Sequence, residues 1–292
     1  NRIGFGSTYS AAAPGVGNGT FVNLPSSGQS GFPAATFAVS LFDAFNTSRF
    51  LNLEISALEA DGRGKIVSSP RVVTADQVKA LIAGIISDFG RLDGLVNNAG
   101  GQFPAPLSMI SANGFQAVIR NNLNGTFLMM REAYTQWMEQ HGGSIVNMTA
   151  DMWGGMPGMG HSGAARSGVD NLTKTAAVEW GHSAVRVNAV APGWIMSSGM
   201  DTYQGAFRAI IPSLAANVPL KRMGTESEVS SVICFLLSQG SAFVNGVTLR
   251  IDGGASLGTR MFPLSDANRQ TPYNGFHRAF IPEVLQQADA SA

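Results

Sequence analysis

The sequence has one cysteine, no net charge and no long apolar run. Cys234 lies inside the apolar stretch VICFLL, which predicts a buried, unreactive thiol, and a single cysteine excludes a disulfide framework. The 19 basic residues balance 19 acidic ones, so we expect neither nucleic acid nor an anionic membrane as a partner. Because no apolar run could cross a bilayer as a helix, we expect no membrane span and predict a cytoplasmic location.

What the sequence does contain is an alternation of short apolar runs and helical segments. Ser144–Met148 and Val185–Val190 predict buried strands, and Gly163–Trp180 between them carries apolar residues at helical spacing. Leu92–Asn97 and Val247–Ile251 predict two further strands. This order is typical of an α/β fold with a parallel sheet, in which ligands bind at the carboxyl ends of the strands.

Capping residues indicate where three of the helices begin. Two of these residues are followed at the third position by Gln77 and Glu228, which completes a capping-box pattern. Gly90 is the predicted end of the first helix. The three capping residues are Thr74, Ser111 and Thr225.

The N-terminal part of the chain has a different character. Residues 1–33 consist mainly of Gly, Ser, Ala, Pro and Asn, which predicts an irregular or disordered arm. Thr36–Ser40 predicts a strand, and the apolar residues of Leu41–Ala60 have a spacing that fits a helix better than a strand. Lys65–Thr74 is rich in β-forming residues and predicts a second strand.

Short motifs in the rest of the chain resemble the short-chain dehydrogenase/reductase family over about residues 75–292. The run Gly100–Phe103 (GGQF) and the phrase HSGAARSGV are similar to the branch that contains peroxisomal trans-2-enoyl-CoA reductase and 2,4-dienoyl-CoA reductase. The four ordered motifs are Asn97–Gly100 (NNAG), Asn122–Gly125 (NLNG), Ala191–Gly193 (APG) and Ile251–Gly254 (IDGG).

This resemblance implies a fold, a reaction and a mode of assembly. The fold is a Rossmann-like parallel sheet, here incomplete in its N-terminal half. The implied reaction is the reduction of an enoyl-CoA or a related small-molecule substrate, with NADP or NAD as the cofactor. The helices expected at Asn113–Glu139 and Gly163–Trp180 imply a homo-oligomer that associates through them.

The catalytic set that the resemblance implies is altered. In the family, a Ser, a Tyr and a Lys act with an Asn on the preceding helix, and the Tyr passes the proton. Asn122 matches the Asn, and Thr149 keeps a hydroxyl at the Ser position. Arg166 keeps a cation at the Lys position but cannot relay a proton. Ser162 at the Tyr position is the serious change, because its hydroxyl is short and far less acidic than a phenol.

Other ionisable residues lie near these positions. Asp151 follows the strand that ends at Met148, so it is either a second acid of the pocket or a loop-capping carboxylate. His161 is either a proton donor or an ordinary loop histidine. No spacing of His, Cys and Asp predicts a metal site. The residues implied to contact the cofactor are Asn98, Ala99, Gly100, Arg166, Pro192, Gly193 and Ile195.

The strand, Gly-rich turn and helix that normally cradle the pyrophosphate are not found. The one candidate, Gly15–Gly19, has no strand before it and is better explained by loop composition. Instead, residues 50–80 resemble the secretin family, the outer-membrane ring channels of type IV pilus and type II secretion systems. We therefore divide the chain into a secretin-like fragment, residues 1–74, and a dehydrogenase-like domain, residues 75–292, and expect weak or no cofactor binding.

Three functions remain open from the sequence. The first is an NAD(P)H-dependent short-chain reductase. The second is an inactive chimera, in which a secretin-like fragment is joined to a dehydrogenase remnant. The third is a cofactor-free interaction protein that associates through its long helices.

Overall fold

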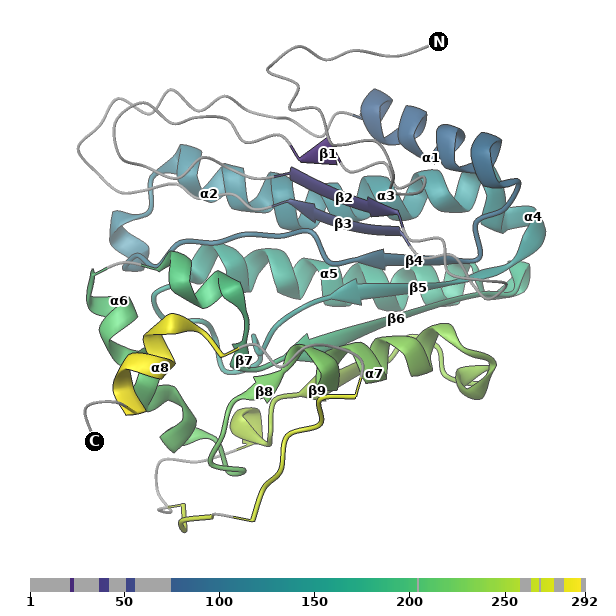
Figure 1. Ribbon diagram of the computed structural model, residues 1–292. Coiled ribbons are helices and arrows are strands. Elements are labelled where there is room, and N and C mark those ends of the chain that lie inside the picture. Colours follow the sequence, from purple (N-terminus) through teal and green to yellow (C-terminus); the bar gives the residue numbers. More distant parts are fainter. Residues whose placement is uncertain are drawn as a thin grey trace, which may run out of the picture.

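A seven-stranded sheet forms the centre of the computed structural model (Figure 1). The structure describes residues 22–23, 37–41, 51–55, 75–203, 205–257, 264–267, 269–275 and 281–289. The sheet order is β1-β2-β3-β4-β5-β6-β9. Its strands are β1 (Val22–Asn23), β2 (Phe37–Leu41), β3 (Leu51–Ile55), β4 (Gly94–Asn97), β5 (Gly143–Met148), β6 (Val185–Pro192) and β9 (Thr248–Ile251).

Strands β4, β5, β6 and β9 are all parallel, as the sequence predicts. Residues of β5 alternate between the two faces of the sheet, so Ile145 packs in one core cluster and Val146 in another. Helices therefore cover both faces, because each apolar face must be buried. The short strands β7 (Ile195–Met196) and β8 (Gly224–Thr225) pair in parallel outside this sheet.

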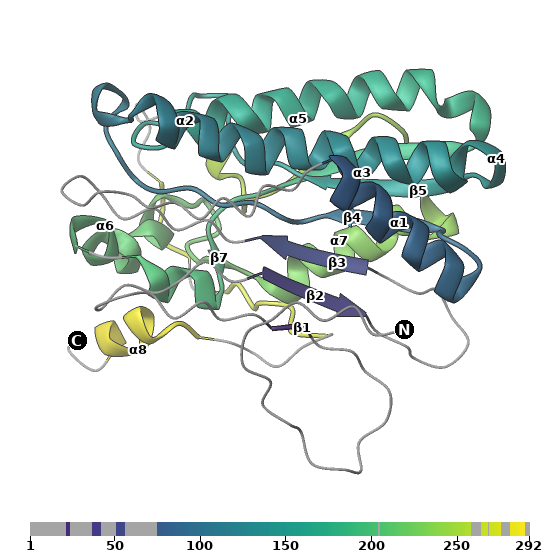
Figure 2. The same cartoon turned by 90° about the horizontal axis from the view of Figure 1, so that it is seen from above.

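The α2–α4 run and α5 lie side by side on one face of the sheet (Figure 2), and α7 packs on the other. Two π-helical segments, Arg120–Asn124 and Tyr134–Met138, join α2, α3 and α4 into one continuous run. The helices are α1 (Ala75–Phe89), α2 (Ala112–Ile119), α3 (Gly125–Ala133), α4 (Glu139–His141), α5 (Gly160–Glu179), α6 (Gly205–Ile210), α7 (Glu226–Leu237) and α8 (Glu283–Asp289).

The capping predictions are confirmed where the structure describes them. The Ser111 hydroxyl accepts a hydrogen bond from the amide of Gly114 at 3.0 Å, and Thr225 and Glu228 form a capping box at the start of α7. Gly90, with a φ of 70°, follows the last residue of α1. The prediction for Cys234 is wrong, because its side chain is exposed on the outer side of α7.

Of the two predictions that the structure tests in the N-terminal region, one is confirmed and one is wrong. Strand β2 lies one residue beyond the predicted Thr36–Ser40. The helix predicted for Leu41–Ala60 is wrong at Leu51–Ile55, which is strand β3. The sequence LNLEI alternates apolar and polar side chains with the period of two that suits a strand, and the longer helical window hid this short pattern. The predicted strand Lys65–Thr74, the cap at Thr74 and the Gly15–Gly19 run lie outside the described residues.

Strand β3 is the second neighbour of β4 in the sheet, on the side opposite β5. It pairs with β4 in parallel at Asn52 and Val96, whereas β1, β2 and β3 pair with one another in antiparallel fashion. Strand β3 thus covers the side of β4 that does not pair with β5.

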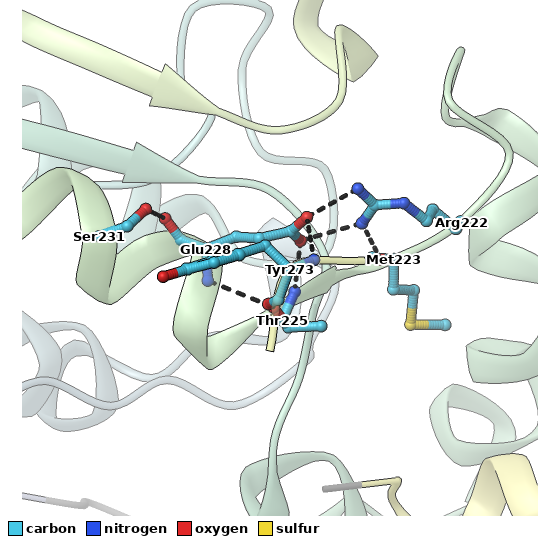
Figure 3. Close-up of polar contacts among 6 residues, drawn as sticks. All are labelled: Arg222, Met223, Thr225, Glu228, Ser231 and Tyr273. Atoms are coloured by element: carbon cyan, nitrogen blue, oxygen red, sulfur yellow. Dashed lines mark hydrogen bonds and ion pairs between the residues drawn. The ribbon is translucent and has the colours of Figure 1, made fainter. Parts of the chain in front are cut away.

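The described parts of the C-terminal segment contact the rest of the same chain. The carbonyl oxygen of Tyr273 accepts from the Thr225 hydroxyl at 2.8 Å, and its amide donates to Glu228 at 3.2 Å (Figure 3). Two further hydrogen bonds, of 2.7 and 2.9 Å, tie Glu228 to Arg222. Beyond this anchor, Val284 of α8 is buried in a small apolar cluster. Its other buried members are Met200, Ile211, Leu214 and Met223.

Candidate active site

The carboxyl ends of β4, β5, β6 and β9 meet at one edge of the sheet, because these strands are parallel (Figure 1). The NNAG motif begins at the last residue of β4, and Thr149 follows the last residue of β5. Pro192 ends β6, and Asp252 follows β9. The topology thus brings polar residues from four distant parts of the sequence to the same edge.

Asn122 holds the loop that follows β4. Its Oδ1 accepts from the amide of Gly101 at 2.8 Å, and its Nδ2 donates to the carbonyl oxygen of Gly101 at 3.1 Å. The side chain is completely buried within the first π-helical segment, and such segments occur frequently at functional sites. This two-sided contact fixes the backbone between β4 and the long helical run.

Arg166 of α5 lies next to the same loop. A side chain at Gly100 would collide with the Arg166 guanidinium and would press against Oδ1 of Asn122, so both groups border Gly100. Nη1 of Arg166 donates to the carbonyl oxygen of Met148 at 2.6 Å, at the end of β5. Burial lowers the pKa of Arg166 to about 10, which leaves the guanidinium charged at neutral pH. The site therefore contains a buried cation beside an amide oxygen.

Thr149 and the turn after β6 complete this edge. The Thr149 hydroxyl donates to the carbonyl oxygen of Val190 at 3.0 Å, so in this structure it faces β6. The amide of Gly193 donates to the carbonyl oxygen of Ile251 at 3.0 Å. Gly193 packs so closely on Asp252 that a Cβ would lie 2.8 Å from the Cβ of Asp252. Glycine is needed here for a close approach of two backbones.

Ser162 lies one helical turn before Arg166 on α5, and its hydroxyl bonds to the loop after β4. Its hydroxyl is fully buried and donates to Oε1 of Gln102 at 3.2 Å. Nε2 of Gln102 in turn lies 3.4 Å from the Tyr203 hydroxyl, to which it donates. Sequence reasoning used Gln102 only as part of the GGQF run and did not consider Tyr203. Nothing local marks a contact between positions 101 residues apart.

The pKa values of Asp151 and His161 are shifted in opposite directions. Burial raises the pKa of Asp151, and the nearby Asp252 raises it further, while Arg250 opposes both effects. Asp151 therefore keeps its proton to a higher pH than an exposed aspartate does.

His161 is not the loop histidine that the sequence suggested, because it lies fully buried in the first turn of α5. Burial lowers its pKa, although a hydrogen bond with the backbone of Met159 acts in the opposite direction. Its ring meets Phe103 edge-on at 4.4 Å, and Nε2 has no hydrogen-bond partner. A neutral histidine packed against an aromatic ring suits the core better than proton transfer.

Within the part of the chain that the structure describes, no three His, Cys, Asp or Glu side chains gather in a way that could hold a metal ion. No helix among these residues is long and apolar enough to cross a membrane.

The comparison with known proteins identifies the family. A family model described as enoyl-(acyl carrier protein) reductase matches residues 45–256. The chain belongs to the short-chain dehydrogenase/reductase family. A probable 2,4-dienoyl-CoA reductase of Bacillus subtilis (strain 168) is 41% identical over 177 residues, which are 60% of this chain and 70% of the relative. The peroxisomal 2,4-dienoyl-CoA reductase of Danio rerio is 38% identical over 194 residues, or 64% of each chain. The chain thus spans about two thirds of the length of these relatives.

A solved member of the family is also similar. The citronellol catabolism dehydrogenase AtuB of Pseudomonas aeruginosa PAO1 is 58% identical, with a TM-score of 0.54. The similarity covers 63% of this chain and 70% of that structure. The Rossmann-like α/β fold and the predicted likeness to the dienoyl-CoA reductases are both confirmed.

The comparisons correct the interpretation of the N-terminal region. Nothing in them supports a secretin fragment at residues 1–80 or a chimera. The family match begins at residue 45 and so includes strand β3 and all of residues 50–80, the stretch that resembles a secretin. A short strand followed by Gly and β-branched residues occurs in many folds, so the resemblance of residues 50–80 to secretins does not establish common ancestry. The domain boundary at residue 74 stays a prediction.

Proposed function

We propose that this protein is an NAD(P)H-dependent reductase of an enoyl-CoA or a related conjugated thioester. The observation that carries this proposal is the meeting of Arg166 and Asn122 around Gly100, at the carboxyl ends of the parallel strands. The names of the dienoyl-CoA reductases among its relatives support the choice of substrate class.

The residues at this edge fit the nicotinamide end of the cofactor. A buried, charged guanidinium beside a glycine offers N–H donors to ribose hydroxyls at a point where backbone can approach closely. When bound, the reduced nicotinamide supplies a hydride. The residues that we assign to this contact are Asn98, Ala99, Gly100, Arg166, Pro192, Gly193 and Ile195.

The pyrophosphate end has no residues that we can assign. In the described part of the N-terminal region the structure contains strands β1, β2 and β3, and no helix among these residues presents an N-terminus to a phosphate. We therefore propose that the dinucleotide is held mainly by its nicotinamide end and that its affinity is low.

The chain's own residues have distinct tasks in the proposed reduction. Once the β-carbon of the enoyl thioester has accepted the hydride, a proton must reach the α-carbon and hydrogen-bond donors must stabilise the enolate oxygen. Asn122 fixes the Gly101 backbone, and Thr149 offers a hydroxyl that only needs to turn away from Val190. Asp151 is a further ionisable group near this edge, and burial raises its pKa. Ser162 is fully buried and donates to Gln102, so it does not take the place of the phenol itself.

A direct assay tests this function. The oxidation of NADPH and NADH is followed with a trans-2-enoyl-CoA and a 2,4-dienoyl-CoA, at cofactor concentrations high enough to offset weak binding. We expect turnover with at least one pair, and a fall of about 100-fold or more in kcat/KM for Arg166→Ala, because a preorganised charge is lost. Arg166→Lys serves as the matched variant that keeps the charge. If neither cofactor is oxidised with either substrate, the cofactor-free interaction protein is the better account.

The proposal also covers the location and the oligomeric state of the protein. We propose a cytoplasmic protein that forms a homo-oligomer through the α2–α4 run and α5. Phe127 on α3 is 44% exposed and Val178 on α5 is 84% exposed, and burying both would favour such an association. Light scattering of Phe127→Ser and Val178→Ser variants tests it, since a smaller mass than that of the wild-type protein is expected.

A further inference from the structure

Three side chains form a directional string that leads outward from the buried part of the site. The Ser162 hydroxyl donates to Oε1 of Gln102 at 3.2 Å, and Nε2 of Gln102 donates to the Tyr203 hydroxyl at 3.4 Å. Ser162 is fully buried, whereas Gln102 and Tyr203 are half-buried. Because the oxygen of Tyr203 accepts from Gln102, its own proton is left to donate to a third group. The string therefore ends in a phenolic O–H at its accessible end.

The position of Tyr203 is fixed by its surroundings. Its ring packs against Phe207 with the ring centroids 4.7 Å apart. Two residues earlier, the Asp201 carboxylate accepts from the amides of Glu283 and Val284, each at 3.2 Å, and thereby ties this loop to α8. The C-terminal segment that carries α8 is itself anchored at Thr225 and Glu228 (Figure 3). The phenol is thus held by contacts on both sides of the loop.

We propose that Tyr203 is a catalytic residue, the phenolic proton donor that replaces the tyrosine missing at position 162, and that Ser162 and Gln102 position it. This inference rests on the proposed reduction of an enoyl thioester. Its physical basis is that one hydrogen bond polarises the next along a chain of donors, so the amide of Gln102 donates more strongly because Ser162 donates to its oxygen.

The proton and electron balance of the step is complete. A reduced nicotinamide bound at this edge would supply a hydride to the β-carbon of the substrate, which would reduce the carbon–carbon double bond and leave an enolate. The O–H bond of Tyr203 then breaks as a C–H bond forms at the α-carbon. The resulting phenolate is stabilised by the N–H of Gln102, since a hydrogen bond to the charged form favours that form. Water returns the proton to the phenolate.

The first test removes the phenolic hydroxyl alone. Tyr203→Phe keeps the ring that packs on Phe207, so the fold is retained, and kcat is expected to fall about 100-fold or more, the usual contribution of a positioned acid. Tyr134→Phe is the matched control, because its hydroxyl contacts Ser183 at 3.0 Å, just before the first residue of β6 and so at the opposite end of that strand from the site. The control loses the same atom and is expected to keep wild-type turnover. If Tyr203→Phe keeps turnover while Asp151→Asn abolishes it, Asp151 is the donor and the proposal is overturned.

The second test asks whether Ser162 acts through Tyr203. Ser162→Ala is expected to lower kcat about 3- to 10-fold, as for the loss of one neutral hydrogen bond. In the Tyr203→Phe background the same change is expected to have almost no further effect, because the group it positions is gone. Independent, multiplying losses would contradict the positioning role.

The third test requires no turnover. The chain has four tyrosines, so the 13Cζ resonance of Tyr203 can be assigned as the signal that Tyr203→Phe removes. We expect a saturated acyl-CoA to shift this resonance with no cofactor present, and Ser162→Ala to shift it as well. A wild-type protein that oxidises no NAD(P)H but shows both shifts would refute the reductase and uphold the phenol contact. A resonance that neither change moves would overturn the contact.

Discussion

The two halves of the central sheet differ in the direction of their strands. Strands β4, β5, β6 and β9 run parallel, so all four carboxyl ends meet at the edge where Asn122 and Arg166 converge. Strands β1, β2 and β3 pair antiparallel, so alternate strands present opposite ends to that edge. A parallel arrangement with crossover helices builds a binding edge, whereas an antiparallel one mainly extends and covers the sheet.

We expect the two halves to differ in which end of a dinucleotide they can hold. The parallel half offers a buried cation, a fixed amide and a glycine turn, which we propose to hold the nicotinamide end. The described strands of the other half offer backbone that is already paired with neighbouring strands. We therefore expect the parallel half to determine the reaction, and the N-terminal half to limit the affinity for the cofactor.

The largest expected effect comes from adding one methyl group to the parallel half. Gly100→Ala places a Cβ against the Arg166 guanidinium and Oδ1 of Asn122, and one of them must move. A displacement of about 1 Å at a reacting centre costs on the order of 100-fold, so kcat/KM is expected to fall by about that factor. Steady-state assays with an enoyl-CoA measure it. A Gly100→Ala protein with wild-type kcat/KM would show that the arrangement of Arg166 and Asn122 around Gly100 does not carry the activity.

A smaller effect is expected at the carboxylate that anchors the C-terminal segment. Burial acts to raise the pKa of Glu228, but hydrogen bonds from Arg222 and from the backbone of Thr225 and Tyr273 outweigh it and lower the pKa. A lowered pKa in the folded state stabilises the fold above the unfolded pKa, and this contribution is lost as the pH falls through the folded value.

We expect Glu228→Gln to cost about 1 kcal/mol of unfolding free energy at neutral pH and almost nothing in acid below the folded pKa. Urea denaturation at a series of pH values measures the difference. A cost that is the same at every pH would show that the charge of Glu228 does not hold the segment.

The smallest expected effect is a gain in stability at a distance from the site. A Cβ at Gly84, in the middle of α1, would meet no atom within 4 Å. Gly84→Ala is therefore expected to stabilise the protein by about 0.5–1 kcal/mol and to leave turnover unchanged. Thermal unfolding measures this, and the variant is the matched control for Gly100→Ala. Lost activity in Gly84→Ala would mean that any added methyl group harms the protein.

The sequence predicted the parallel half well and the rest poorly, for physical reasons. The apolar runs of β4, β5, β6 and β9 are marked by composition, and ordered motifs place the edge. Strand β3 is five residues long, and its alternation is too short to outweigh a helical window. Gln102 and Tyr203, which we propose as site residues, are 101 positions apart in the sequence, and the loop that carries Tyr203 is bonded to α8. Such long-range contacts leave no local pattern in a single sequence.

The most direct test of the account is calorimetry with NADPH and with NADH on the whole chain. If only the parallel half of the sheet holds the dinucleotide, both isotherms are expected to be too weak for a micromolar dissociation constant. Micromolar binding of either cofactor would show that the N-terminal part supplies the missing phosphate contacts, and would contradict the division of labour between the two halves.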